Sequence, residues 1–142
     1  EYDLVWLARG DAEMPLFDAE GDTSRRHLLC GPYKLSASAP RIVENFLDMG
    51  HFAFVHEHLL GHRDHCEIPD YHVVHDAWGL VVESAQAWQP KARADASEAA
   101  LVDYRYEVRA PFQAALYKGK QRDGIALFIC PSNQNVLRFG SG

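Results

Sequence analysis

The sequence predicts an α+β domain in which an antiparallel β-sheet packs against a helix. Three observations support this prediction. One segment after Pro40 carries apolar residues at helical spacing, and several short strand-like runs separated by turn residues follow residue 70. Strands also do not alternate with helices, as they would in a parallel α/β fold. The length of 142 residues suits one domain with a single core.

The first part of the chain is predicted to contain two strands and one helix. Strand-like alternation occurs over 1–9 and again over 27–38, with an acidic loop between them. Pro40 opens the helix, because proline is tolerated in the first turn, where its missing N–H has no partner to lose. Apolar side chains then recur at three- and four-residue intervals as far as Met49. Residues 57–70 are predicted to form a loop.

The rest of the chain is predicted to be a ladder of strands. A hairpin is expected over 71–89, with its turn near 76–79, and 90–100 is predicted to be a surface loop. Four more strands are expected at 101–110, 112–118, 124–130 and 135–139. One helix is barely enough to cover the apolar face of so many strands, so the sheet and its cover are expected to be incomplete, with a further helix in a missing C-terminal part.

Charge and hydropathy exclude two classes of partner. The chain has 14 Lys and Arg against 20 Asp and Glu, a net charge of −6, whereas nucleic-acid binding requires clustered basic residues. The longest clean apolar run, 125–130, is far too short to span a membrane. We therefore predict neither a nucleic-acid nor a membrane partner. The first residue is not Met and the chain ends Gly-Ser-Gly, which predicts a piece of a longer polypeptide.

Cysteine usage predicts the compartment. Cys30, Cys66 and Cys130 form no C-x-x-C pair, so neither a zinc knot nor a thioredoxin-type site is expected. Free, buried thiols in a reducing environment are the simplest interpretation, and this predicts a cytoplasmic protein.

Histidines are the unusual feature of the composition. Seven of the eight lie between His51 and His75. Asp48 and His51 are three residues apart and would share one helical face. His51 and His56 are five apart, which on a regular helix separates them by about 140°. Both can therefore face one metal ion only if the helix breaks between them, and Gly50 makes such a break plausible.

The run 44–56 resembles the iron-site motif of the Rieske non-haem iron oxygenases, in the catalytic domain of their α-subunit. That motif is Asn, then Asp, two residues, His, four residues, His. Asn45, Asp48, His51 and His56 occur here at those intervals. Similarity to the vanillate-demethylase-like branch of the family extends over 57–61, 69–73 and the strand 2–6.

The resemblance implies roles for these residues. His51 and His56 would be the two imidazole ligands of a mononuclear Fe(II), a metal that two imidazoles and one carboxylate hold with open positions for O₂. Asp48 would accept a hydrogen bond from a ligand histidine and lie on the path of electrons from a neighbouring subunit. The residues implied in substrate binding are Asn45, Phe46 and Phe52.

The resemblance also implies a fold and an activity. The fold is a helix-grip domain of the START or Bet v1 kind. The activity is hydroxylation or O-demethylation of an aromatic or similar apolar substrate with O₂. Electrons would come from NAD(P)H through a reductase and a ferredoxin-type chain. The intact subunit would carry a [2Fe–2S] cluster and assemble as a homo-oligomer, a trimer.

Two departures from the family pattern limit what this chain is expected to do alone. None of the cysteines lies in the C-x-H or C-x-x-H pairs that hold a Rieske cluster. In this family the third iron ligand is an Asp on a helix that would fall after Gly142. Residues 1–142 are therefore predicted to be one catalytic-domain portion, inactive by itself, without the Rieske domain and without that C-terminal helix.

Two alternative functions remain open at this point. Helix-grip folds also bind hydrophobic ligands in the same cavity without catalysis. Alternatively, the loop from His58 to His65, which also contains His62, could make this a small zinc-binding protein.

Overall fold

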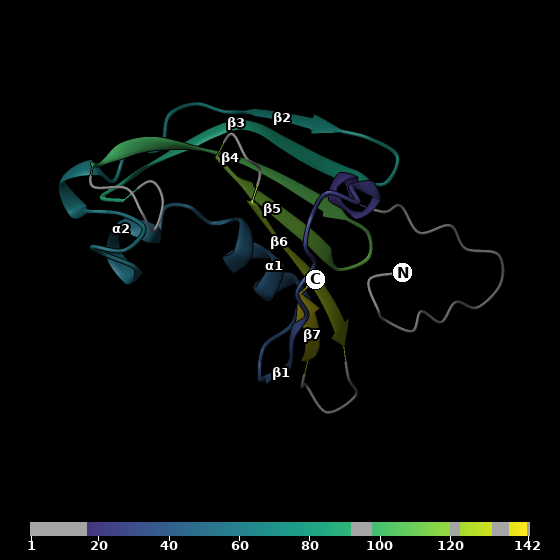
Figure 1. The fold of residues 1–142 in the computed structure, drawn as a ribbon. Helices are drawn as coiled ribbons and strands as arrows, with labels where there is room; N and C mark the ends of the chain where they lie inside the picture. Colours follow the sequence, from purple (N-terminus) through teal and green to yellow (C-terminus); the bar gives the residue numbers. More distant parts are fainter. Residues whose placement is uncertain (1–16, 92–97, 120–122, 132–136, 142) are drawn as a thin grey trace, which may run out of the picture.

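Seven strands form one antiparallel sheet in the computed structural model, which describes residues 17–91, 98–119, 123–131 and 137–141 (Figure 1). The strand order is β1-β7-β6-β5-β4-β3-β2, a meander from β2 to β7 with β1 added beside β7. The strands are β1 (Cys30–Leu35), β2 (His72–His75), β3 (Gly79–Gln89), β4 (Ala100–Arg109), β5 (Gln113–Lys118), β6 (Asp123–Pro131) and β7 (Leu137–Ser141). The predicted α+β class is confirmed.

One helix packs on the middle of this sheet. α1 spans Ala39–Leu47, has Pro40 in its first turn, and lies against β5 and β6 (Figure 1). Its buried Ala39 packs with Leu127 and Ile129 of β6, and apolar side chains of the next two turns join that cluster. The other helical segments of the described ranges are α2 (Phe52–Val55) and two 3-10 turns, η1 (Asp18–Gly21) and η2 (Arg63–His65).

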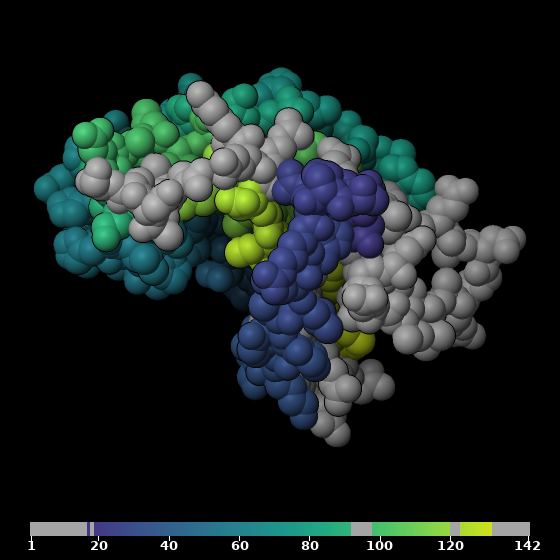
Figure 2. Space-filling view, viewed as in Figure 1, coloured from purple at the N-terminus to yellow at the C-terminus, as the bar shows by residue number. Residues whose placement is uncertain are grey.

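The other face of the sheet is covered by the segment before β1. Phe128 lies between Leu127 and Ile129 in β6, so its side chain points to the face opposite α1. Phe17 packs against it there, with ring centroids 5.8 Å apart, and both join Ala115 and Tyr117 of β5 in a second cluster. Figure 2 shows the 17–30 segment in purple across the surface of the molecule.

Buried charges occupy this second face. Glu107 of β4 lies opposite Ala115 of β5 in the strand register, and its side chain is fully buried. Arg105 donates to one of its carboxylate oxygens, and Nη2 of Arg109 lies 3.2 Å from the other. Nη1 of Arg109 also donates to Asp76, in the turn before β3, at 2.8 Å. This network therefore ties β4 to the β2–β3 hairpin.

The β2–β3 turn is organised by the same aspartate. Oδ1 of Asp76 accepts the backbone N–H groups of Trp78 and Gly79, each at 2.8 Å. The hydrogen bond from Trp78 is the main cause that holds the pKa of Asp76 below its usual value, and the Arg109 guanidinium adds to it. The predicted turn at 76–79 is thus confirmed, with a carboxylate as its cap.

Most of the predicted strands are found where the sequence pattern placed them. β4, β5 and β6 match the predicted runs to within one residue at each end. β3 contains a bulge, since its register with β4 shifts between Val82 and Ala85 and Ser84 has a φ of 58°. The strand predicted over 1–9 lies outside the described residues.

One expectation about the thiols is wrong. Cys30, Cys66 and Cys130 form no disulfide with one another, but all three are exposed rather than buried. Cys30 and Cys130 lie in β1 and β6, and Cys66 ends the η2 turn, where the sheet and the helices leave them uncovered.

The helices in the described part of the chain include none that is long and apolar enough to cross a membrane.

Candidate active site

The two histidines of the motif are brought together by a break in the helix. α1 ends at Leu47, because Asp48 has extended ψ of 108°, and α2 starts only at Phe52. Oδ1 of Asp48 accepts the backbone N–H of Gly50 at 2.8 Å, which stabilises the turn between the helices. The ring centroids of His51 and His56 consequently lie 5.1 Å apart, with an angle of 63° between the rings. The break near Gly50 that the spacing required is therefore present.

Asp48 also orients one of these rings. Its Oδ2 lies 3.2 Å from Nδ1 of His51, whose side chain is 16% exposed. A carboxylate can only accept, so we assign the proton of a neutral His51 to Nδ1. This assignment leaves the lone pair on Nε2 for another ligand, as in the carboxylate–histidine–metal arrangement of many metal sites. The hydrogen bond expected between Asp48 and one ring is thus present, while its catalytic role stays a prediction.

The spacing of the rings suits a shared metal ion. Two imidazoles with bonds of about 2.1 Å to one ion have ring centres roughly 4.5–5.3 Å apart at octahedral or tetrahedral angles. The separation of His51 and His56 falls in that range. Within 17–91 and the other described ranges, no group of three His, Cys, Asp or Glu side chains is placed to hold a metal. The separation of the two rings is therefore compatible with two ligands of one metal ion, and their role as iron ligands stays a prediction.

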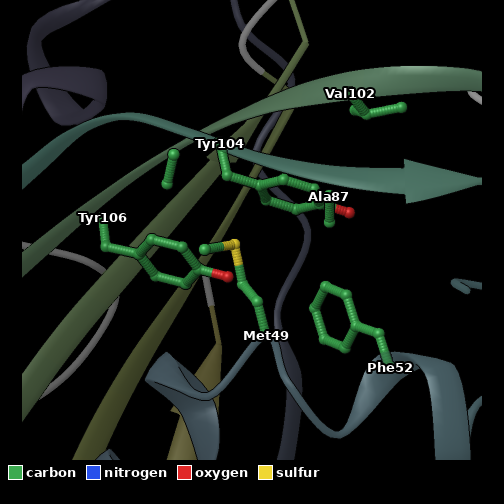
Figure 3. Close-up of a cluster of buried hydrophobic side chains, with 7 residues drawn as sticks. Met49, Phe52, Ala87, Val102, Tyr104 and Tyr106 are labelled. Atoms are coloured by element: carbon green, nitrogen blue, oxygen red, sulfur yellow. The ribbon is translucent and has the colours of Figure 1, made fainter. Parts of the chain in front are cut away.

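The ring of Phe52 packs against the rings of both His51 and His56. It is 8% exposed, and its ring centroid lies 5.1 Å from that of His51, 6.3 Å from that of His56 and 5.8 Å from that of Tyr104. Figure 3 shows Phe52 and Met49 facing the tyrosines of β4. Phe52 is therefore both a core residue and a wall of the candidate site.

The other two predicted substrate residues lie along α1. Phe46 is half-buried, and its ring meets Tyr106 edge-on, with centroids 6.4 Å apart. Asn45 is exposed on the same helix. The structure thus brings Phe46 into the cluster under the site and leaves Asn45 at the surface. Their roles toward a substrate stay predictions.

Sequence reasoning missed the residues of the sheet beneath the site. Tyr104 and Tyr106 of β4 stack with centroids 6.1 Å apart, and both are almost fully buried. The side-chain amide of Gln89, also fully buried, donates to the hydroxyl of Tyr104. The signal available in the sequence was the spacing of two tyrosines by two residues in a predicted strand, which places both on one face.

These tyrosines predict a loss of stability at alkaline pH. Burial raises the pKa of Tyr104 to about 12, from an ordinary value near 10. The folded chain then keeps a proton that the unfolded chain has lost. Stability is therefore fully present below about pH 10 and falls as pH rises through about 12, by about 2–3 kcal/mol for this residue. Urea unfolding at about pH 9 and about pH 11.5 measures the difference.

Two variants separate this effect from general alkaline denaturation. Tyr104→Phe should show a smaller fall in the free energy of unfolding between the two pH values. Tyr71→Phe removes a tyrosine that is 50% exposed and should leave the fall unchanged. An equal fall in the wild type and in Tyr104→Phe would contradict the assignment.

The loop that follows α2 packs closely against that helix. Backbone bonds from Leu60 to His56 (2.9 Å) and from His58 to Gly61 (2.8 Å) close a tight loop. Gly61 is buried, and a Cβ at this position would lie 2.7 Å from the backbone nitrogen of Ala53. This close approach sets the position of α2 and, with it, that of the histidine pair.

The histidine-rich loop does not assemble a three-ligand site among the described residues. The ring of His65 stacks on Trp88 at 4.3 Å, and the rings of His58 and His62 lie 5.4 Å apart. Nδ1 of His62 accepts the backbone N–H of Asp64 at 3.2 Å. These contacts are those of a loop packed on the edge of β3, and the zinc-site alternative gains no support from them.

Comparisons with known proteins agree with the motif. The family model described as vanillate O-demethylase oxygenase C-terminal domain matches residues 35–138. Probable methylxanthine N7-demethylase NdmC of Pseudomonas sp. (strain TJI-51) is 35% identical over 145 residues, covering 94% of this chain and 50% of that protein. Methylxanthine N1-demethylase NdmA of Pseudomonas putida is 36% identical over 72 residues, covering 48% of this chain and 20% of that protein.

Solved structures share the fold. NdmA of Pseudomonas putida CBB5 with caffeine has a TM-score of 0.61, and its QL mutant with caffeine one of 0.64, each at 22% identity. Both alignments cover 91% of this chain, and 39% and 36% of the respective chains. The chain thus spans half the length of NdmC and a smaller share of NdmA.

Proposed function

This chain belongs to the vanillate O-demethylase oxygenase C-terminal domain family, the catalytic domains of Rieske oxygenases, and from this we propose that it holds the mononuclear iron of such an enzyme. The observation that carries the proposal is the pair of rings at the break between α1 and α2. His51 and His56 lie 5.1 Å apart there, and Asp48 hydrogen-bonds one of them. Two neutral imidazoles are donors that Fe(II) accepts in oxygenases of this kind.

Asp48 and Phe52 favour metal binding by the pair of His51 and His56. Asp48 holds the proton of His51 on Nδ1, so Nε2 is free to bind the ion. Phe52 lies under both rings and excludes water from that side. Fe(II), when bound, supplies activation of O₂ for insertion of one oxygen atom into a substrate C–H bond. The remaining ligand is proposed to be a carboxylate outside the described residues.

The proposed reaction is oxidative demethylation or hydroxylation of a small aromatic or heteroaromatic substrate. The names of NdmC and NdmA refer to removal of methyl groups from nitrogen, and the family description refers to removal from oxygen. Hydroxylation of either methyl group gives a product that releases formaldehyde. The balance is one O₂, two electrons and two protons per turnover, with one oxygen atom entering the methyl C–H bond and the other leaving as water.

The proposed reaction requires partners that deliver electrons. We propose NAD(P)H as their source, a reductase and a ferredoxin-type chain as carriers, and a [2Fe–2S] cluster in the intact subunit as the last donor. Asp48, half-exposed beside His51, is proposed to lie where those electrons arrive from a neighbouring subunit of a homotrimer. Asn45, Phe46 and Phe52 are proposed to contact the substrate. The same fold binding an apolar ligand without chemistry would be a hydrophobic-ligand-binding module, and the metal test distinguishes the two functions.

Metal binding tests the assignment. Anaerobic equilibrium dialysis of the chain against Fe²⁺, followed by metal quantification, should show binding that His51→Ala and His56→Ala each weaken by about 100-fold or more. His62→Ala is the matched control, because it removes a histidine of the loop beside Trp88 and should leave affinity unchanged. Iron binding that neither substitution at the pair alters would remove the motif interpretation. Loss only in the control would favour a metal at the loop instead.

A further inference from the structure

The hydroxyl of Tyr106 is buried directly beneath the break between α1 and α2. The residue is 1% exposed, and its hydroxyl has no hydrogen-bond partner among the described residues. Tyr104, stacked beside it, differs in that its hydroxyl accepts the amide of Gln89. A buried hydroxyl without a partner destabilises the fold, and phenylalanine would fill the same space without that cost. Packing alone therefore does not account for a tyrosine at this position.

The segment that carries Asp48 lies over Tyr106. Phe46 meets the ring of Tyr106 edge-on from one side of Asp48, and Met49 packs on it from the other. Figure 3 shows the hydroxyl end of Tyr106 directed toward the side chain of Met49. Burial is the main cause of the raised pKa of Tyr106, and the charge of Asp48 is one of the causes that add to it. Asp48 thus lies in the chain between two residues that pack against this tyrosine.

Asp48 can accept a further hydrogen bond. A carboxylate has lone pairs for about four hydrogen bonds. Oδ1 accepts the N–H of Gly50 and Oδ2 faces Nδ1 of His51. The site therefore contains a buried donor in need of an acceptor and, above it, an acceptor with capacity to spare.

We propose that Tyr106 is a positioning residue whose hydroxyl donates across one water molecule to the Asp48 carboxylate and so fixes the orientation of His51 toward the metal. The inference rests on the proposed function. The order of action is Tyr106, then Asp48, then His51. Tyr106 touches neither substrate nor metal, and its effect reaches the metal through the tautomer and angle of one ring.

Tyr106→Phe removes only this hydroxyl. Fe²⁺ affinity, measured by the same dialysis, should fall by about 10-fold. Long-range ¹H–¹⁵N correlation spectra of the metal-free chain should change from one dominant His51 tautomer to a mixture of the two. Unchanged affinity and an unchanged tautomer would overturn the proposal.

Tyr104→Phe is the matched control. It removes a neighbouring buried hydroxyl that has a partner in Gln89, so it should lower the melting temperature and leave Fe²⁺ affinity and the His51 tautomer unchanged. Equal losses of affinity in both variants would mean a general packing effect and would overturn the proposal. His51→Ala distinguishes failure of the positioning role of Tyr106 from failure of the proposed function. If it abolishes iron binding while Tyr106→Phe has no effect, only the positioning role fails. If it too has no effect, the proposed function fails.

Discussion

Replacement of Glu107 by alanine is expected to lower the free energy of unfolding by about 3–5 kcal/mol. The Glu107 carboxylate is fully buried and receives hydrogen bonds from Arg105 and Arg109. Without it, Arg109, which is only 8% exposed, keeps only the carboxylate of Asp76 as an ionic partner among the described residues. Removal of one member of a buried ion pair leaves charge without compensation in a region of low dielectric, which is the reason for the large effect. Urea unfolding followed by tryptophan fluorescence measures it.

Two further variants make this result specific. Glu44→Ala breaks an exposed ion pair with Arg41 on the surface of α1 and should cost less than about 1 kcal/mol. The double replacement of Glu107 by leucine and Arg109 by methionine removes both charges and should restore much of the lost stability. A cost for Glu107→Ala no greater than that of Glu44→Ala would show that the buried pair does not stabilise the sheet.

Gly61→Ala is expected to disturb the metal pair as well as the fold. The new Cβ would lie 2.7 Å from the nitrogen of Ala53, 2.8 Å from its Cα and 2.8 Å from the carbonyl carbon of Phe52, all of them backbone atoms of α2. These atoms cannot rotate away, so α2 must move. We expect a loss of about 1–3 kcal/mol of stability. We also expect a loss of Fe²⁺ affinity of about 10-fold or more, because ligands tolerate displacements of only about 0.5 Å.

Gly21→Ala is the control for this change. No atom lies within 4 Å of a Cβ built at Gly21, so the same substitution there should be neutral or slightly stabilising. Unchanged affinity in Gly61→Ala, despite a measurable loss of stability, would show that the loop supports the fold without setting the position of the histidines.

Local patterns were enough to predict most elements of this fold. Turn residues and β-rich runs placed β4, β5 and β6 within one residue, because a strand in a meander is set by its own alternation and by short loops. The five-residue interval between His51 and His56 required a helix break, and the structure places that break between Leu47 and Phe52. These features depend on residues close in sequence.

Features that depend on register and on distant partners could not be predicted. Tyr104 and Tyr106 lie under the histidines only because β4 is a central strand with α2 over this face. The pairing of β1 with β7 and the bulge near Ser84 likewise follow from the tertiary structure. The buried Glu107 is charged in the sequence, and only its neighbours in space explain why it is tolerated inside the protein.

The position of β1 in the sheet has a consequence for the order in which the chain folds. Cys30 pairs with Ser141, and Ala39 at the start of α1 packs on Leu127 and Ile129, so these contacts join segments that are synthesised far apart in time. The β2–β6 meander consists of neighbours in sequence and can form first, whereas contacts between remote segments slow folding. On the ribosome, the helix that carries the motif must wait for β6 before it can dock. We therefore expect β1 and α1, with the Asp48 that follows α1, to be among the last parts of the molecule to reach their final geometry.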